Sequence, residues 1–306
     1  MNIRFLHPLF QFLFFGNFFY GVCVIALAIE ASLQQKLPLN SASFYLLLFI
    51  ATLIYYNLAF SKIDKTSGEE NPRLNWHRKH LKGLRLLQIA YVLVFVFLSL
   101  SVWQAFVNQF PQLSALEVFL LLLFPCTAVL YYGISTKYFR TGNLRNIGWL
   151  KPFIIGFTWA GVVGVLPQLF YQLSQNNAYE LNTVAILLFI KNFMFISVLS
   201  IMFDIKDYAR DYNLELKTFV VKFGLRKTIF SVLIPLLLLG WLSFIVYGVS
   251  KDFSLIKIFL NTLPFLLCIV ISLELQKRKS IYFYLLIIDG LMLVKALCGS
   301  VAMLYF

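Results

Sequence analysis

Long apolar runs alternate with short polar segments along the whole chain. Each run has roughly 17–25 residues, which is enough for an α-helix to cross the hydrocarbon core of a bilayer. The first run is too long and too poorly flanked to be a cleaved signal peptide. The pattern predicts an all-α, polytopic membrane protein with one transmembrane domain over residues 1–306. Its nine expected spans are at about 9–30, 41–60, 86–107, 115–133, 150–167, 183–203, 229–248, 255–273 and 281–304.

Composition supports this class. Sixty per cent of the residues are hydrophobic and 18% are aromatic, a profile that excludes a soluble domain of 306 residues. The four cysteines lie inside apolar runs without metal-ligand or redox spacing, and we interpret them as packing residues. His77 and His80 lie in a basic segment, where a solvated or headgroup-facing role is favoured over a metal site.

Basic residues are distributed unevenly between the connecting segments. Most of the 26 lysines and arginines fall in the N-terminal segment and in the second, fourth, sixth and eighth loops. The positive-inside rule therefore places the N-terminus and these loops in the cytoplasm and the C-terminus outside. This placement accounts for the net charge of +13 without nucleic acid, and we expect a bacterial cytoplasmic membrane.

Away from the span ends, three charged residues lie inside predicted spans: Lys191, Asp289 and Lys295. A charge exposed to lipid is costly, so each must face protein, a polar cavity or an interface. We expect them to make hydrogen bonds between helices.

Asp204, Asp207 and Asp211 follow the apolar run 183–203. On a helix, their spacing of i, i+3 and i+7 places them within roughly 60° of one face, with Lys206 and Arg210 on the other side. Three carboxylates on one face repel each other unless a cation lies among them. Mg²⁺ is the natural candidate, because it takes oxygen ligands and shares them with substrate phosphate. The alternative is a solvated helix end outside the membrane.

A second polar helix end has the same spacing. Asn57, Phe60 and Asp64 stand at i, i+3 and i+7 where the second predicted span ends. The two helix ends are four spans apart, as in a weak internal repeat. Because both open on the predicted cytoplasmic side, we expect them to face each other across one cavity. Acidic helix ends, basic loops and aromatic walls would suit a lipid with a polyanionic head.

Here the chain resembles the UbiA family of intramembrane prenyltransferases. The second family motif, Asp-x-x-Asp-x-x-x-Asp, is matched by Asp204, Asp207 and Asp211. The segment 217–227 that follows is also similar to the family's, as is the fourth loop, where residues 138–140 lead to Gly148 and then to 156–160.

The first family motif, Asn-Asp-x-x-Asp-x-x-x-Asp, is poorly matched. Aligned without a gap, its aspartates fall on Asn57, Phe60 and Asp64, so one acid remains. Aligning its asparagine on Asn57 places the acids on Leu58, Ser61 and Lys65, so none remains. We prefer the first alignment.

The resemblance implies transfer of a prenyl group from an isoprenoid diphosphate to an aromatic or lipid acceptor, with Mg²⁺ assisting departure of the diphosphate. With four acids instead of six, the site should hold one metal better than two. It implies Asp204, Asp207 and Asp211 as catalytic residues, and these three with Asp64 as metal ligands. The implied substrate-binding residues are Asn57, Asp64, Lys137, Arg140 and Arg145.

Two other functions stay open. A family member with an impaired site would bind a phosphorylated isoprenoid lipid without transferring it. A transporter or assembly factor is the weaker alternative, because transport predicts discontinuous helices and ion ligands inside the membrane.

Overall fold

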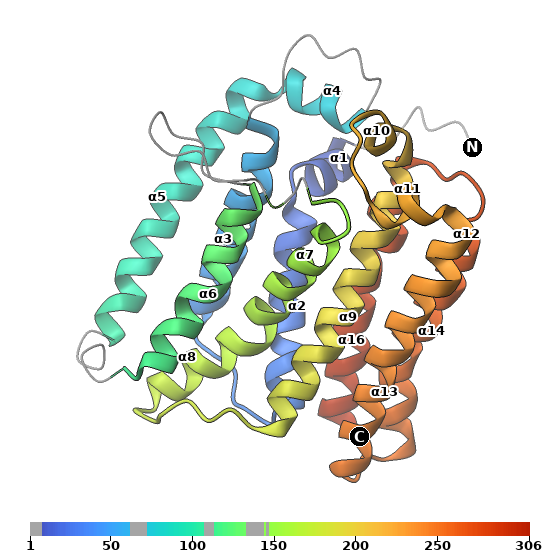
Figure 1. Cartoon of the computed structure of the whole chain (residues 1–306). Coiled ribbons are helices and arrows are strands. Elements are labelled where there is room, and N and C mark those ends of the chain that lie inside the picture. The colour runs from blue at the N-terminus through green and yellow to red at the C-terminus, as the bar shows by residue number, and fades with distance from the viewer. Residues whose placement is uncertain (1–7, 62–71, 107–112, 133–143, 145–146) are drawn as a thin grey trace. The chain divides into compact units, whose positions relative to one another are not determined.

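The computed structural model describes residues 8–61, 72–106, 113–132, 144 and 147–306, with side chains omitted at 59–61 and 103–106. This part of the chain is helical and has no strand (Figure 1), which confirms the all-α class. Its α-helices are α1 (Pro8–Phe15), α2 (Phe18–Gln34), α3 (Ala42–Ser61), α4 (Pro72–Lys79), α5 (Leu81–Phe106), α6 (Ala115–Tyr132), α7 (Lys151–Ala160), α8 (Leu166–Ser174), α9 (Thr183–Lys206), α10 (Tyr208–Asn213), α11 (Phe219–Phe223), α12 (Leu225–Thr228), α13 (Ile234–Ser250), α14 (Leu255–Glu274), α15 (Ile281–Phe283) and α16 (Gly290–Tyr305).

Seven helical stretches among the described residues are long and apolar enough to cross a membrane. The number rises to eight if α1 and α2, which meet at a bend of 59°, form one broken span. Helix α3 is not among the seven, because its side chains are described only over Ala42–Leu58. An integral membrane protein is therefore supported, whereas the predicted count of nine is not confirmed.

Short π-helical turns interrupt three of the long helices. They are Gly161–Val165 between α7 and α8, Ile229–Leu233 between α12 and α13, and Tyr284–Ile288 between α15 and α16. Each π turn adds a residue to the helical repeat and so rotates the faces on its two sides relative to each other.

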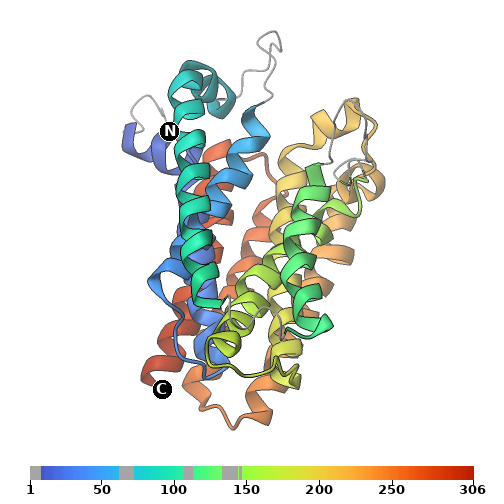
Figure 2. The ribbon, with the colours of Figure 1, turned by 90° about the vertical axis from the view of Figure 1, so that its left-hand side faces the viewer.

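The chain forms two compact units, which we describe separately; the single transmembrane domain stays a prediction. The first unit comprises residues 1–25 and 40–111. Within it α3 and α5 run side by side, as both views show (Figures 1 and 2). Ile50, Leu53 and Leu98 are buried between them. Gly21 is required by the close approach of the Phe49 ring, because an added Cβ would lie 2.6 Å from it.

A buried asparagine marks the corner between α1 and α2. Asn17 has a positive φ of 68° and is fully buried. Its Nδ2 donates to Asn57 Oδ1 at 2.7 Å, and its Oδ1 accepts from the Arg73 guanidinium. Asparagine tolerates this left-handed backbone better than most residues. The corner is thereby tied to α3 and α4.

The second unit comprises residues 26–39 and 112–306. In it α9 packs against both α7 and α13, and α14 packs against α16. Small residues permit the close approach of α7 to α9, since a Cβ added at Gly156 would lie 2.8 Å from the Phe193 carbonyl oxygen. The start of α7 is thereby placed beside the end of α9, where the aspartates lie.

Candidate functional site

The three aspartates follow one nearly continuous helical path. Helix α9 ends at Lys206 and α10 begins at Tyr208. Asp207 lies between them, yet its N–H still donates to Phe203 O at 3.3 Å, and the Asp211 N–H donates to Asp207 O at 2.9 Å. The predicted spacing therefore places the three carboxyl groups near one another.

Asp204 is the most buried of the three. Its side chain has no exposed surface, and its Oδ1 forms an ion pair with the Lys151 ammonium at the start of α7. Its Oδ2 is also buried and has no hydrogen-bond partner among the described residues. A buried carboxylate oxygen without a donor is costly, so this atom calls for a cation, a water or a ligand.

Lys151 was predicted only as part of the basic cytoplasmic loop. The backbone of the preceding turn explains its position: a Cβ added at Gly148 would lie 2.6 Å from the Lys217 carbonyl carbon. Glycine thus lets the turn press against the loop that follows the aspartates. Nothing in the sequence distinguishes Lys151 from the other lysines of the loops. Only the packing shows that its ammonium reaches Asp204.

Asp207 and Asp211 differ in exposure. The Asp207 side chain is 36% exposed and pairs with Lys206 at 3.2 Å, whereas Asp211 is buried. The expectation that Lys206 lies away from the acidic face was therefore wrong, because its long side chain folds back to the neighbouring carboxylate. Both aspartates are close enough to Asp204 for their charges to act on it.

Aromatic rings follow the same two helices away from this cluster. Phe153 of α7 lies 6.0 Å from Phe193 of α9 and 5.8 Å from Phe219, measured between ring centroids. Phe193 in turn lies 6.3 Å from Phe189, which lies 5.6 Å from Phe157. We call these five residues the phenylalanine ladder. Phe153 follows Lys151 by two positions in α7, so the ladder begins near the Lys151–Asp204 pair.

The described residues form an incomplete metal site. No group of three or more His, Cys, Asp or Glu side chains in this part of the chain is arranged to hold a metal ion. The Asp204 Oδ1 faces the Lys151 ammonium instead. The buried Asp204 Oδ2 is nevertheless an oxygen of the kind that Mg²⁺ prefers, and Mg²⁺ is commonly bound by one or two carboxylates plus substrate phosphate. The donor set suits such a shared site rather than a cage made of protein alone.

The other predicted site residues are placed differently. Asp64, Lys137, Arg140 and Arg145 lie outside the described residues. Asn57 lies in the first unit, with its Oδ1 bonded to Asn17. The cavity shared by the two polar helix ends therefore stays a prediction.

A second charged group in the same unit was missed by sequence reasoning. Glu30 of α2 is buried, and its Oε1 and Oε2 accept from Lys191 at 3.0 Å and from Lys295 at 2.6 Å. Gln34 Nε2 donates to Glu30 Oε1 at 2.8 Å and also to Asn261 Oδ1 at 2.7 Å. We call these five residues the Glu30 network. It confirms the expected interhelical hydrogen bonds of both lysines.

The Glu30 network is separate from the aspartates. Lys191 precedes Asp204 by 13 positions on one helix, which corresponds to roughly 20 Å along its axis. Glu30 itself gave little signal, because a single glutamate near a predicted span end is typical of an interface.

Comparison with known proteins establishes the fold. No family model matches the chain, and no curated protein matches it. A solved structure of digeranylgeranylglyceryl phosphate synthase in membranes, a UbiA-type prenyltransferase, superposes with a TM-score of 0.56 at 15% identity. The superposition covers 97% of this chain and 99% of that chain. This likeness shows the fold.

Proposed function

We propose that this protein is a membrane prenyltransferase that moves a prenyl group from an isoprenoid diphosphate to an aromatic or lipid acceptor. The observation that carries the proposal is the buried Asp204 carboxylate, which has one oxygen on Lys151 and one without a partner among the described residues. It lies at the end of a membrane helix in the fold of a known prenyltransferase.

Each part of the site has a role in this reaction. The bond that breaks joins the allylic carbon of the donor to the diphosphate oxygen, and both electrons leave with the diphosphate. The Lys151 ammonium would stabilise that departing charge. Asp204, Asp207 and Asp211 would hold Mg²⁺, which when bound supplies further positive charge at the leaving group.

The phenylalanine ladder would act on the other half of the donor. After the bond breaks, the prenyl group carries a positive charge that water would quench. Aromatic faces attract a cation and exclude water, so they can hold the allylic cation until the acceptor attacks it. The acceptor then loses a proton to complete the substitution.

A second function on the same scaffold is binding without transfer. Its support is the first polar helix end, where the only acid of the motif alignment is Asp64 and the Asn57 Oδ1 is engaged by Asn17. A site with weaker metal binding could retain a phosphorylated isoprenoid and yet fail to expel diphosphate. Binding without diphosphate release would identify this function.

The test is to incubate the purified protein with Mg²⁺ and a panel of prenyl diphosphates, and to follow both ligand binding and diphosphate release. Asp207→Asn should abolish the Mg²⁺-dependent part of binding, because a neutral amide does not replace the attraction of a carboxylate for a divalent ion. Asp252→Asn removes an exposed acid at a distant loop and is the matched control. Equal Mg²⁺-dependent binding by both variants would leave the aspartates as a solvated helix end.

A further inference from the structure

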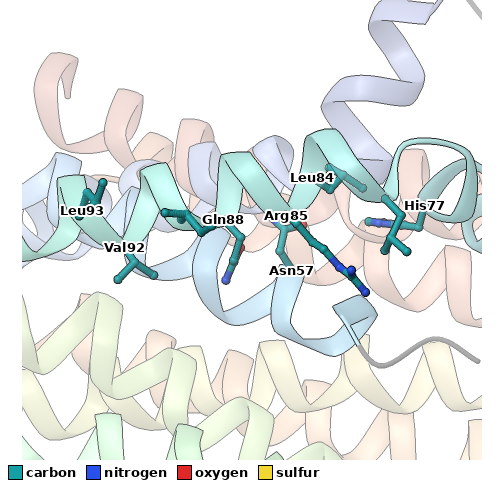
Figure 3. A pocket seen from close by; sticks show the side chains of 9 residues that line it. Asn57, His77, Leu84, Arg85, Gln88, Val92 and Leu93 are labelled. Carbon is teal, nitrogen blue, oxygen red and sulfur yellow. The ribbon is translucent and has the colours of Figure 1, made fainter.

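A pocket of about 420 Å³ lies in the first unit, and none of the three aspartates is among its lining residues. Its walls come from α3, α4 and mainly α5, and the volume is within the range of pockets that hold small molecules. Asn57, Arg85 and Gln88 lie together toward the α4 end, whereas Val92 and Leu93 lie further along α5 (Figure 3). The pocket thus has a polar end and an aliphatic end.

The polar end carries a positive charge, on Arg85. Arg85 is exposed and forms no ion pair with any residue in the described part of the chain. The neighbouring His77 is buried, and its Nε2 donates to Phe15 O, 2.9 Å away. Burial lowers the pKa of His77 to about 4, assisted by the nearby Arg73 charge, so the imidazole is neutral at pH 7. Arg85 is therefore the cation of this pocket.

Two further polar side chains line the pocket, Asn57 and Gln88, and each has atoms whose hydrogen bonds are still to be made. Asn57 Oδ1 already accepts from Asn17, which leaves the Asn57 amide hydrogens for a ligand. Gln88 Nε2 donates to Ile54 O at 3.1 Å, but its buried Oε1 has no partner among the described residues. Arg85 and Asn57 together favour an anionic oxygen, and a phosphate suits the guanidinium best.

The depth of these groups matches a phospholipid. The apolar stretch of α5 that can cross a membrane begins at Leu81, so Arg85 lies about 6 Å inside its start. Val92 and Leu93 lie roughly 11–12 Å further along the axis. This is the order of phosphate and acyl chain in a bilayer leaflet. Ile89 and Leu93 are 59% and 66% exposed, so chains can continue along α5 beyond the pocket.

From these features we infer that the pocket binds a membrane phospholipid with a net negative headgroup. Its phosphate lies at Arg85 and Asn57, and its acyl chains lie along the aliphatic wall of α5. Basic pockets at the membrane interface between helices recognise such headgroups. The lining belongs to the first unit and includes none of the three aspartates. It shares Asn57 with the substrate-binding residues that the family resemblance implies, so the experiment has to distinguish a phospholipid from a prenyl diphosphate.

The probe is an equimolar mixture of phosphatidylglycerol and phosphatidylcholine with identical acyl chains, added to the delipidated protein in detergent and followed by native mass spectrometry. We expect one retained phosphatidylglycerol and little phosphatidylcholine, because the choline group brings a second positive charge. Equal occupancy by the two lipids would overturn the proposal.

Arg85→Gln should weaken phosphatidylglycerol binding by roughly tenfold or more, the effect of losing one charge-assisted hydrogen bond. Lys82→Gln removes the same charge from an exposed position of the same helix that does not line the pocket. The Lys82→Gln variant should bind phosphatidylglycerol like the parent protein. An equal loss of binding in both variants would show that general surface charge, not Arg85 in the pocket, attracts the lipid.

Val92→Trp keeps the test decisive if Arg85→Gln does not fold. The indole should fill the aliphatic end and lower lipid occupancy while Arg85 stays in place. Val96→Trp, one turn further along α5 and outside the lining, should not. Competition by soluble glycerol phosphate as strong as by the lipid, or displacement by a prenyl diphosphate without Mg²⁺, would overturn the assignment. Asp207→Asn should leave phospholipid binding unchanged, whatever the outcome for prenyl transfer.

Discussion

Two buried carboxylates in the second unit have opposite surroundings. Glu30 accepts from Lys191, Lys295 and Gln34, so both of its oxygens are saturated and positive charge exceeds negative. Asp204 accepts from Lys151 alone, keeps one oxygen without a partner among the described residues, and has two further aspartates nearby. Their charges act against ionisation of Asp204, whereas those around Glu30 favour its ionised form.

The difference separates a structural group from the proposed ligand-binding group. A buried charge with all its hydrogen bonds made stabilises one arrangement of helices and has nothing left to offer a ligand. A buried charge that is only half satisfied is costly in the folded protein unless something else binds there. The Glu30 network therefore holds α2, α9 and α16 together, whereas the half-satisfied Asp204 is the basis of the proposed ligand site.

The largest effect should come from breaking the saturated group. Glu30→Gln leaves two buried lysines without a counter-charge, and we expect a loss of about 3–5 kcal/mol in the free energy of unfolding. Thermal unfolding in detergent measures it. Glu180→Gln, at an exposed glutamate of the same unit, is the control and should be nearly neutral. A stable Glu30→Gln protein would show that the network is not structural.

His77 is a buried titratable group that is uncharged at neutral pH, and it makes the stability of the protein depend on pH. His77 has a pKa of about 4 in the folded protein against an ordinary value of 6.5, chiefly because burial disfavours the imidazolium. Between pH 6.5 and 4 the unfolded chain therefore binds a proton that the folded protein does not.

Stability should fall as the pH drops through this window, by up to about 3 kcal/mol, and this contribution should be fully present above pH 6.5. Unfolding midpoints measured from pH 7.5 to 4 test this expectation. His77→Gln should flatten the profile, whereas His80→Gln, at an exposed turn position just after the same helix, should keep most of it. An unchanged slope in His77→Gln would assign the dependence to other groups.

The packing around Glu30 can be tested without removing a charge. An added Cβ at Gly299 would lie 2.6 Å from Glu30 Cγ and Oε1, so Gly299→Ala must displace the carboxylate. We expect a loss of roughly 1–3 kcal/mol. Gly290→Ala in the same helix meets no atom within 4 Å and should be neutral or slightly stabilising. Similar unfolding midpoints for the two variants would contradict a tight fit at Glu30.

The smallest effect on stability should come from the unsaturated group. Asp207→Asn relieves repulsion within the cluster at the cost of an exposed ion pair with Lys206, so the free energy of unfolding should change by less than about 0.5 kcal/mol. The same variant should lose Mg²⁺-dependent binding of a prenyl diphosphate, which isothermal titration measures. A large loss of stability would show that Asp207, like Glu30, stabilises the fold.

Much of the fold followed from local patterns. Apolar runs of membrane length predicted the class, and the predicted span bounds fall on the observed helices, for example 183–203 on α9 and 255–273 on α14. The count of nine was not confirmed, because a corner at Asn17 bends the first run and the side chains of α3 are described only as far as Leu58. The corner does not change the hydropathy of the run, so the length of an apolar run does not reveal it.

The sequence by itself determined that the chain is helical and inserts in a membrane, and it singled out the three aspartates. A bilayer requires helical structure of any chain with such apolar runs, since backbone polar groups in lipid must form hydrogen bonds within a helix. The three aspartates stand out because positions i, i+3 and i+7 share one face of a helix.

Only the tertiary structure decided which charges meet. Lys191 and Lys295 reach Glu30 across 161 and 265 positions of sequence, and Lys151 reaches Asp204 across 53. In the sequence, these three lysines look like two isolated membrane charges and one loop residue. Whether a buried carboxylate is saturated or open to a ligand depends on helices that pack through small residues such as Gly156 and Gly299, and no local pattern encodes that contact.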